Sequence, residues 1–123
     1  MQQLFVGDLS LSDGVIESVV LSESEVRVGF RLWDGSKARF WFTGVIGMKD
    51  RNSVGQDIES LDTESGASLF QGAEGAYAAE LLEERRADRA APIVRYAFIG
   101  SWMMKPILEV YAEEMDVQRT NEF

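Results

Sequence analysis

Apolar residues recur at every second position along two neighbouring segments of the chain, residues 26–32 and 38–43. In each segment every second residue is apolar, and the sequence Asp34-Gly35-Ser36 lies between the segments. A period of two residues is typical of β-strands whose two faces meet different surroundings. The pattern therefore predicts a β-hairpin with one apolar face, which consists of Val26, Val28, Phe30, Leu32, Ala38, Phe40 and Phe42.

The requirement for one apolar face also predicts the hairpin register. Asp-Gly favours a two-residue turn, but that turn would place Phe30 opposite Arg39 and mix the two faces. A three-residue loop places Phe30 opposite Phe40 and Val28 opposite Phe42. Because a slip of one residue inverts the sidedness of a strand, we expect burial to select the longer loop or an equivalent bulge.

Other segments have the composition of strands. Residues 15–21 are rich in β-branched side chains, and residues 93–101 and 107–117 are largely apolar. The last two strands would be joined by a tight connection at Trp102–Pro106. Gly44 is expected to mark a bend or bulge after the hairpin.

One helix is expected at residues 73–89, which are rich in Ala, Leu, Glu and Arg. The preceding stretch, residues 52–70, is expected to be loop with a short strand around 57–61. Strands, a helix and more strands without parallel βαβ spacing predict the α+β class. We expect a single domain over residues 1–123, with a mostly antiparallel sheet of five to seven strands curled over the helix.

The composition restricts the chemistry that the chain can perform. There is no histidine and no cysteine, so the commonest nucleophile–base pairs and transition-metal ligands are missing. No phosphate-cradling or nucleophile-elbow motif occurs. We therefore expect no catalytic residue, no metal and no cofactor. A carboxylate-dependent enzyme stays open, because carboxylate pairs or tyrosines could serve as acid and base.

The net charge of −9 sets the class of partner that we expect. A strongly acidic chain repels phosphate backbones and anionic lipids, which argues against nucleic acid and membranes. A basic protein is favoured instead, although the charge could serve solubility alone. The N-terminal residues have neither a basic leader nor a long apolar stretch, so we expect a cytoplasmic protein.

The outer face of the predicted hairpin is the first candidate site. It carries cations and indoles that could bind a small carboxylate or phosphate, namely Arg31, Arg39, Trp33 and Trp41. The expected register places the two arginines opposite each other, where they require a counter-charge. The plainer interpretation is that Glu109 and Glu113 neutralise them.

An acidic run and an apolar connection form the second candidate site. The acids include Asp57, Glu59, Asp62 and Glu64, which could attract a basic partner or simply form a solvated loop. Trp102, Met103 and Met104 would lie in the last connection, where three large apolar groups are typical of an interaction site. A turn that plugs the core, or a homodimer contact, would explain them equally well.

Three stretches resemble a known group of proteins: Asp13-Gly14-Val15-Ile16, Val54-Gly55-Gln56-Asp57-Ile58, and Phe98-Ile99-Gly100-Ser101-Trp102 leading into Ile107-Leu108-Glu109-Val110. With them, most of the chain is similar to small acidic bacterial proteins of unknown function, some of which look like immunity proteins. The resemblance implies a non-enzymatic domain that blocks the site of a partner such as a toxin. This is our leading hypothesis, ahead of the anion-binding module and the enzyme.

Overall fold

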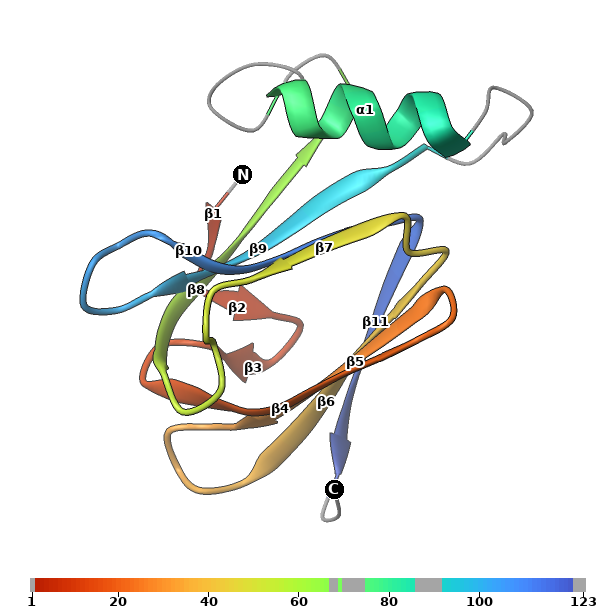
Figure 1. The fold of residues 1–123 in the computed structure, drawn as a ribbon. Coiled ribbons are helices and arrows are strands. Elements are labelled where there is room, and N and C mark those ends of the chain that lie inside the picture. Colours follow the sequence, from red (N-terminus) through yellow and green to blue (C-terminus); the bar gives the residue numbers. More distant parts are fainter. Residues whose placement is uncertain (1, 67–68, 70–74, 86–91, 121–123) are drawn as a thin grey trace.

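The computed structural model describes residues 2–66, 69, 75–85 and 92–120, and Figure 1 shows a structure made mostly of β-strands. Most of the described residues belong to strands, and the helix among them is short. The elements are β1 (Gln2–Gln3), β2 (Phe5–Val6), β3 (Leu9–Ser10), β4 (Gly14–Ser22), β5 (Glu25–Arg31), β6 (Lys37–Thr43), β7 (Gly47–Asp50), β8 (Asp57–Ser65), α1 (Gly75–Arg85), β9 (Val94–Gly100), β10 (Pro106–Ala112) and β11 (Glu114–Thr120).

Within the described residues, nine strands form one sheet in the order β11-β6-β5-β4-β8-β9-β10-β7, with β1 beside β8, and β2 pairs with β3 separately. All pairs are antiparallel, as predicted. Only two residue pairs join β4 to β8, Gly14 with Ile58 and Val15 with Asp57. This narrow join divides the sheet into two halves, which face each other as two layers (Figure 1).

The core lies between the two layers and is built around four phenylalanines. The Phe98 ring on β9 lies 5.1 Å from Phe40, 6.3 Å from Phe42 and 6.5 Å from Phe30, measured between ring centroids. All four side chains are fully buried. The predicted sidedness of the hairpin is therefore confirmed, because the alternating apolar residues of β5 and β6 all face this core.

The expected α+β fold is wrong. The two halves of the sheet face each other across the apolar core. The helix α1 packs on the outer side of the half that contains β8, β9 and β10 (Figure 1). Tyr77 on the helix contacts Tyr111 on β10 at a centroid distance of 5.3 Å. The helix approaches closely because Gly47 on β7 has no side chain, and a Cβ there would lie 2.5 Å from Leu81. A short helix offers too few large apolar groups to serve as the centre of the core, whereas the facing phenylalanine-rich strands supply them.

The helix described, α1, covers part of the predicted range 73–89, and the remainder of that range lies outside the described residues. The strand count was underestimated for two reasons. Strands β1, β2, β3 and β7 are too short to show an alternating pattern. The segment expected as one strand at 107–117 is two strands, which are separated at Glu113, where the backbone N–H donates to the carbonyls of Thr43 and Gly44.

The hairpin register differs from the prediction by two residues. Val28 pairs with Phe40, and Phe30 pairs with Ala38. The loop does have three residues, but they are Trp33, Asp34 and Gly35 rather than Asp34, Gly35 and Ser36, as the Leu32 N–H to Ser36 carbonyl bond of 2.7 Å shows. The third position of such a loop takes a positive φ, and Gly35 supplies it at 86°. A shift of two residues leaves the faces unchanged.

The remaining local predictions have mixed outcomes. Gly44 does mark a bend between β6 and β7, with a φ of 63°. Strand β8 was expected only around 57–61, inside a loop, but it continues to Ser65 because it pairs with β9 along its length. Arg31 does not lie opposite Arg39, because Arg31 pairs with Lys37 and Arg39 pairs with Gly29.

Burial of Tyr96 in the core predicts a loss of stability in alkaline solution. Burial, together with the nearby charge of Glu114, raises the pKa of the Tyr96 hydroxyl above its ordinary value of 10.0. The folded state then resists ionisation more than the unfolded state, so stability is full below pH 10.0 and falls as the pH rises through the folded pKa. Urea unfolding of the wild type and of Tyr96→Phe across this range should show a shallower decline in the variant. Equal declines would contradict this assignment.

Candidate functional site

The turn between β9 and β10 presents three large apolar side chains to solvent. Trp102 is 83% exposed, Met103 is 68% exposed and Met104 is 56% exposed. Their backbone is nevertheless held in place, because the Gly100 N–H donates to the Lys105 carbonyl at 2.9 Å and the Met104 N–H donates to the Gly100 carbonyl at 3.0 Å. The alternative in which this turn plugs the core is therefore wrong.

The turn carries backbone strain at Met104. Its φ is 52°, a left-handed conformation that costs a residue with a side chain roughly 1–2 kcal/mol. The flanking hydrogen bonds and the paired strands β9 and β10 offset this cost. The turn lies at the far end of the β9–β10 hairpin (Figure 1), and its three consecutive apolar side chains are exposed there.

Asp57 ties this turn to the neighbouring strand β8. Its backbone carbonyl accepts a hydrogen bond from the Ser101 N–H at 3.0 Å, and its carboxylate accepts one from the Trp102 indole Nε1 at 3.1 Å. The exposed indole is thus oriented by a fixed carboxylate. We name the group of Asp57, Trp102, Met103 and Met104 the apolar turn.

The other predicted acids of β8 do not join the apolar turn. Glu59 accepts a hydrogen bond from Ser12 Oγ at 3.2 Å. Glu64 and Asp62 pair with the guanidinium of Arg95, at 2.7 and 3.8 Å. Glu64 is seven residues from Asp57 along an extended strand, a separation of roughly 23 Å. The interpretation as a solvated acidic loop is also wrong, since these residues belong to a paired strand.

A buried ionic cluster, which was not predicted from the sequence, lies on the outer face of the β8–β9–β10 layer. Glu109 is fully buried and accepts hydrogen bonds from Arg95 Nε at 2.9 Å and Nη2 at 2.6 Å, and also from Arg51. Burial alone would lower the pKa of Arg95, but the hydrogen bonds and charge of Glu109 outweigh it and raise that pKa. The sequence signal was Arg95 and Glu109, each of which lies between apolar residues in a strand of the same predicted hairpin.

The cluster has a structural rather than a binding arrangement. The carboxylate of Glu109 is enclosed and already accepts from two guanidiniums, which leaves it little capacity for a ligand. Glu109 therefore does not neutralise the hairpin arginines, as the plainer interpretation of that face had expected, because it lies in the other half of the sheet.

The hairpin face instead obtains its counter-charges locally. Glu17 interrupts the pairing of β4 with β5 as a bulge, and it pairs with Arg31 at 3.3 Å and with Lys37 at 2.9 Å. Trp41 donates its indole N–H to Glu25 at 2.8 Å, and the Arg27 guanidinium lies 4.8 Å from the Trp41 ring centroid. Trp33 lies in the hairpin loop and is 67% exposed. These contacts leave Arg31 and Trp41 already engaged with carboxylates.

Comparisons with known proteins give no independent guide to this site. The chain matches no protein-family model, no curated protein and no solved structure. Among the described residues, no helix has the length and apolar character needed to cross a membrane. Among the candidate sites, the apolar turn is the one whose large apolar side chains are exposed on an ordered backbone.

Proposed function

We propose that this chain is a non-enzymatic protein-binding domain that recognises its partner through the apolar turn. The observation that carries the proposal is the exposure of three consecutive large apolar side chains on a hydrogen-bonded turn. Binding energy at interfaces is concentrated in a few such residues, with tryptophan foremost, and methionine adapts to uneven surfaces. A turn that is already ordered loses little conformational entropy on binding.

The partner that fits this turn is a protein with an apolar pocket in a basic surface. The net charge of −9 would accelerate encounter with such a surface, and the Asp57 carboxylate lies at the base of the turn. The domain would act by occupying the partner's site, with no bond made or broken. An immunity-like role, in which the blocked site belongs to a toxin, is the specific form of this proposal.

Truncation of the apolar turn tests the proposal. Immobilised wild-type chain at low salt should retain a partner that the double variant Trp102→Ala/Met103→Ser does not retain. Titration of that partner should show a dissociation constant weakened by roughly 30-fold or more, the loss expected for a central tryptophan. The replaced side chains are exposed, so the unfolding midpoint should be almost unchanged.

Trp33→Ala is the matched control, since Trp33 is a second exposed tryptophan in a hairpin loop. Binding of the partner by this variant should equal that of the wild type. Retention of the same proteins by the double variant would contradict the proposal, as would a control variant that loses the partner to the same extent.

A further inference from the structure

Strand β11 forms one end of the sheet. It pairs with β6 over seven residues, Glu114 to Thr120, and no strand of the described chain pairs with its second edge. In an antiparallel strand, half of the backbone N–H and C=O groups point to each side, so an unpaired edge is a template for another strand. The opposite end of the sheet, β7, has only four residues, and short edges offer little to pair with.

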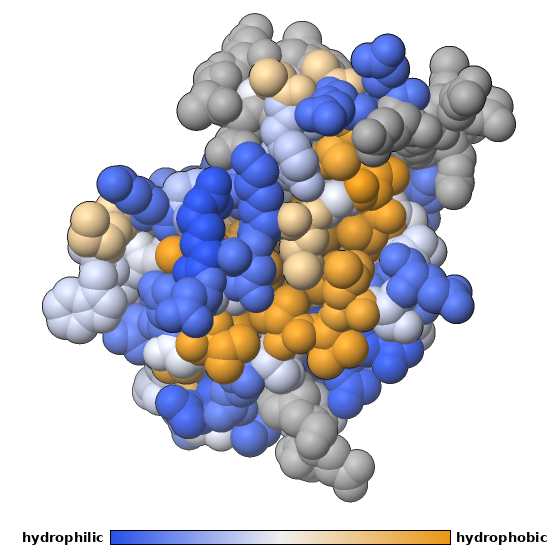
Figure 2. Space-filling view, in the orientation of Figure 1, coloured by the Kyte–Doolittle hydropathy of each residue, from blue (hydrophilic) through white to orange (hydrophobic). Residues whose placement is uncertain are grey.

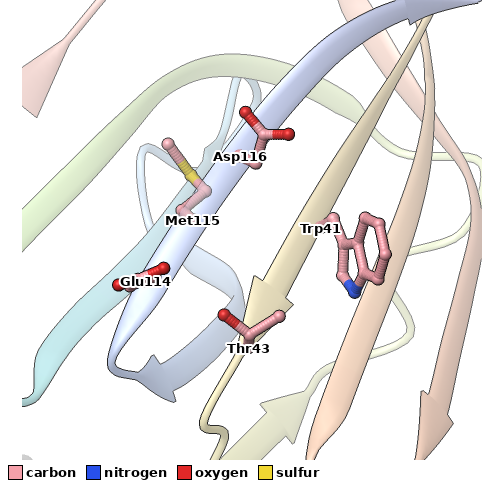
Figure 3. Close-up of a pocket in the computed structure, with 5 residues that line it drawn as sticks. All are labelled: Trp41, Thr43, Glu114, Met115 and Asp116. Atoms are coloured by element: carbon pink, nitrogen blue, oxygen red, sulfur yellow. The ribbon is translucent and has the colours of Figure 1, made fainter.

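Two hollows lie beside β11 and meet at Met115, which lines both of them. The first has a volume of about 370 Å³ and lies between β6 and β11, where Trp41 pairs with Asp116 and Thr43 with Glu114 (Figure 3). The second has a volume of about 290 Å³ and lies between β11 and the β2–β3 hairpin. A strand added to β11 would therefore have a hollow available on each of its faces.

The two hollows differ in chemistry. The first carries two exposed carboxylates, Glu114 and Asp116, together with the Trp41 indole. The second is lined mainly by the apolar side chains of Val6, Leu9, Met115 and Val117. The cation in the second hollow, Arg119, lies 3.9 Å from the carboxylate of Asp8. Figure 2 shows apolar side chains gathered on this side of the molecule, around β7, β11 and the β2–β3 hairpin.

We propose that β11 binds an extended segment of a partner protein in which basic and apolar residues alternate. Main-chain hydrogen bonds to the edge would give affinity, and alternate side chains would enter the two hollows and give specificity. Basic side chains would face Glu114 and Asp116, and apolar side chains would pack on Met115 and Val117. A second copy of this chain is disfavoured, because two chains that each have a net charge of −9 repel each other.

This surface goes beyond the proposed function, because β11 is separate from the turn between β9 and β10 (Figure 1). Its test uses a capped peptide of alternating lysine and valine, as long as β11. The peptide should bind saturably and should protect from hydrogen exchange those backbone amides of Glu114–Thr120 that point away from β6. A peptide with the same residues in separate blocks, and an alternating glutamate and valine peptide, should bind much more weakly.

Charge reversal locates the recognition on the protein. Glu114→Lys/Asp116→Lys should weaken binding of the lysine and valine peptide roughly tenfold or more. Glu23→Lys/Glu83→Lys changes the net charge equally at exposed sites outside β11, and should weaken it far less. The Trp102→Ala/Met103→Ser variant should bind the peptide normally, so failure of one proposal is distinguishable from failure of the other.

Several results would overturn the proposal. If the peptide with lysine and valine in separate blocks bound as tightly as the alternating peptide, simple charge attraction would explain the binding. Protection from hydrogen exchange at amides outside β11 would place the site elsewhere. Protection of β11 that rises with protein concentration, without peptide, would show that a second copy is the occupant. Absence of saturable binding by the lysine and valine peptide would remove the site altogether.

Discussion

Replacement of Glu109 by alanine should lower the free energy of unfolding by about 3–5 kcal/mol, because it leaves the buried Arg95 guanidinium without its main counter-charge. Glu109 is fully buried, and the Arg95 side chain is 7% exposed. Arg51 contributes less to the loss, since its side chain is 45% exposed and water can solvate it once the contact is gone. Urea unfolding followed by fluorescence measures the change, and the thermal midpoint should fall by roughly 10 °C or more.

Two further variants separate the charge from the packing. Glu59→Ala removes a carboxylate from strand β8 of the same half of the sheet, and it should cost at most about 1 kcal/mol, since Glu59 is only partly buried. The double variant Glu109→Leu/Arg95→Met should be more stable than Glu109→Ala, because it removes both buried charges and fills the space with apolar groups. A Glu109→Ala protein as stable as the Glu59→Ala protein would show that Glu109 and its buried contact with Arg95 do not make the predicted contribution to the free energy of unfolding.

Replacement of Phe98 by alanine should have an effect of similar size, a loss of about 3–5 kcal/mol. The ring of Phe98 on β9 contacts the rings of Phe30, Phe40 and Phe42, which lie in the facing layer. Its removal leaves a cavity between two layers that are fixed by their strand pairing and cannot collapse far. The denaturant midpoint should fall with the slope unchanged.

Phe5→Ala is the matched control for this change. Phe5 is 58% exposed on β2, so the same substitution there should alter the free energy of unfolding by roughly 0.5 kcal/mol or less. Phe98→Leu should recover part of the loss, since leucine refills some of the cavity. Equal destabilisation by Phe98→Ala and Phe5→Ala would show that the layers do not meet at Phe98.

Local pattern predicted the faces of the strands more reliably than their partners. The alternation of Val28, Phe30, Phe40 and Phe42 depends on burial alone, and burial is what the structure shows. The register depends on which loop residue takes the positive φ, and Gly35 decides this. The fold class depends on long-range pairing, such as β11 with β6, for which a single sequence carries no local signal.

The candidate site was predicted only in part, because local pattern identifies its apolar residues but not their neighbours from other strands. Trp102, Met103 and Met104 stand out in sequence because three large apolar residues interrupt two strands at a tight connection. The choice of Asp57 as their neighbour, rather than Asp62 or Glu64, depends on the pairing of β8 with β9. Adjacency in sequence had grouped these acids together, whereas the strand separates them.

The position of β11 in the sheet has a consequence for how the chain assembles. Strands β4, β5 and β6 follow one another and can pair as soon as they are made, as can β9 and β10, because only short loops must close. The outer edge of β6 must wait for β11, which follows only after the whole stretch between Thr43 and Glu114 has been synthesised. During that interval the edge of β6 that will pair with β11 has unpaired backbone groups. We expect misassembly to occur through pairing of this edge with strands of other nascent chains.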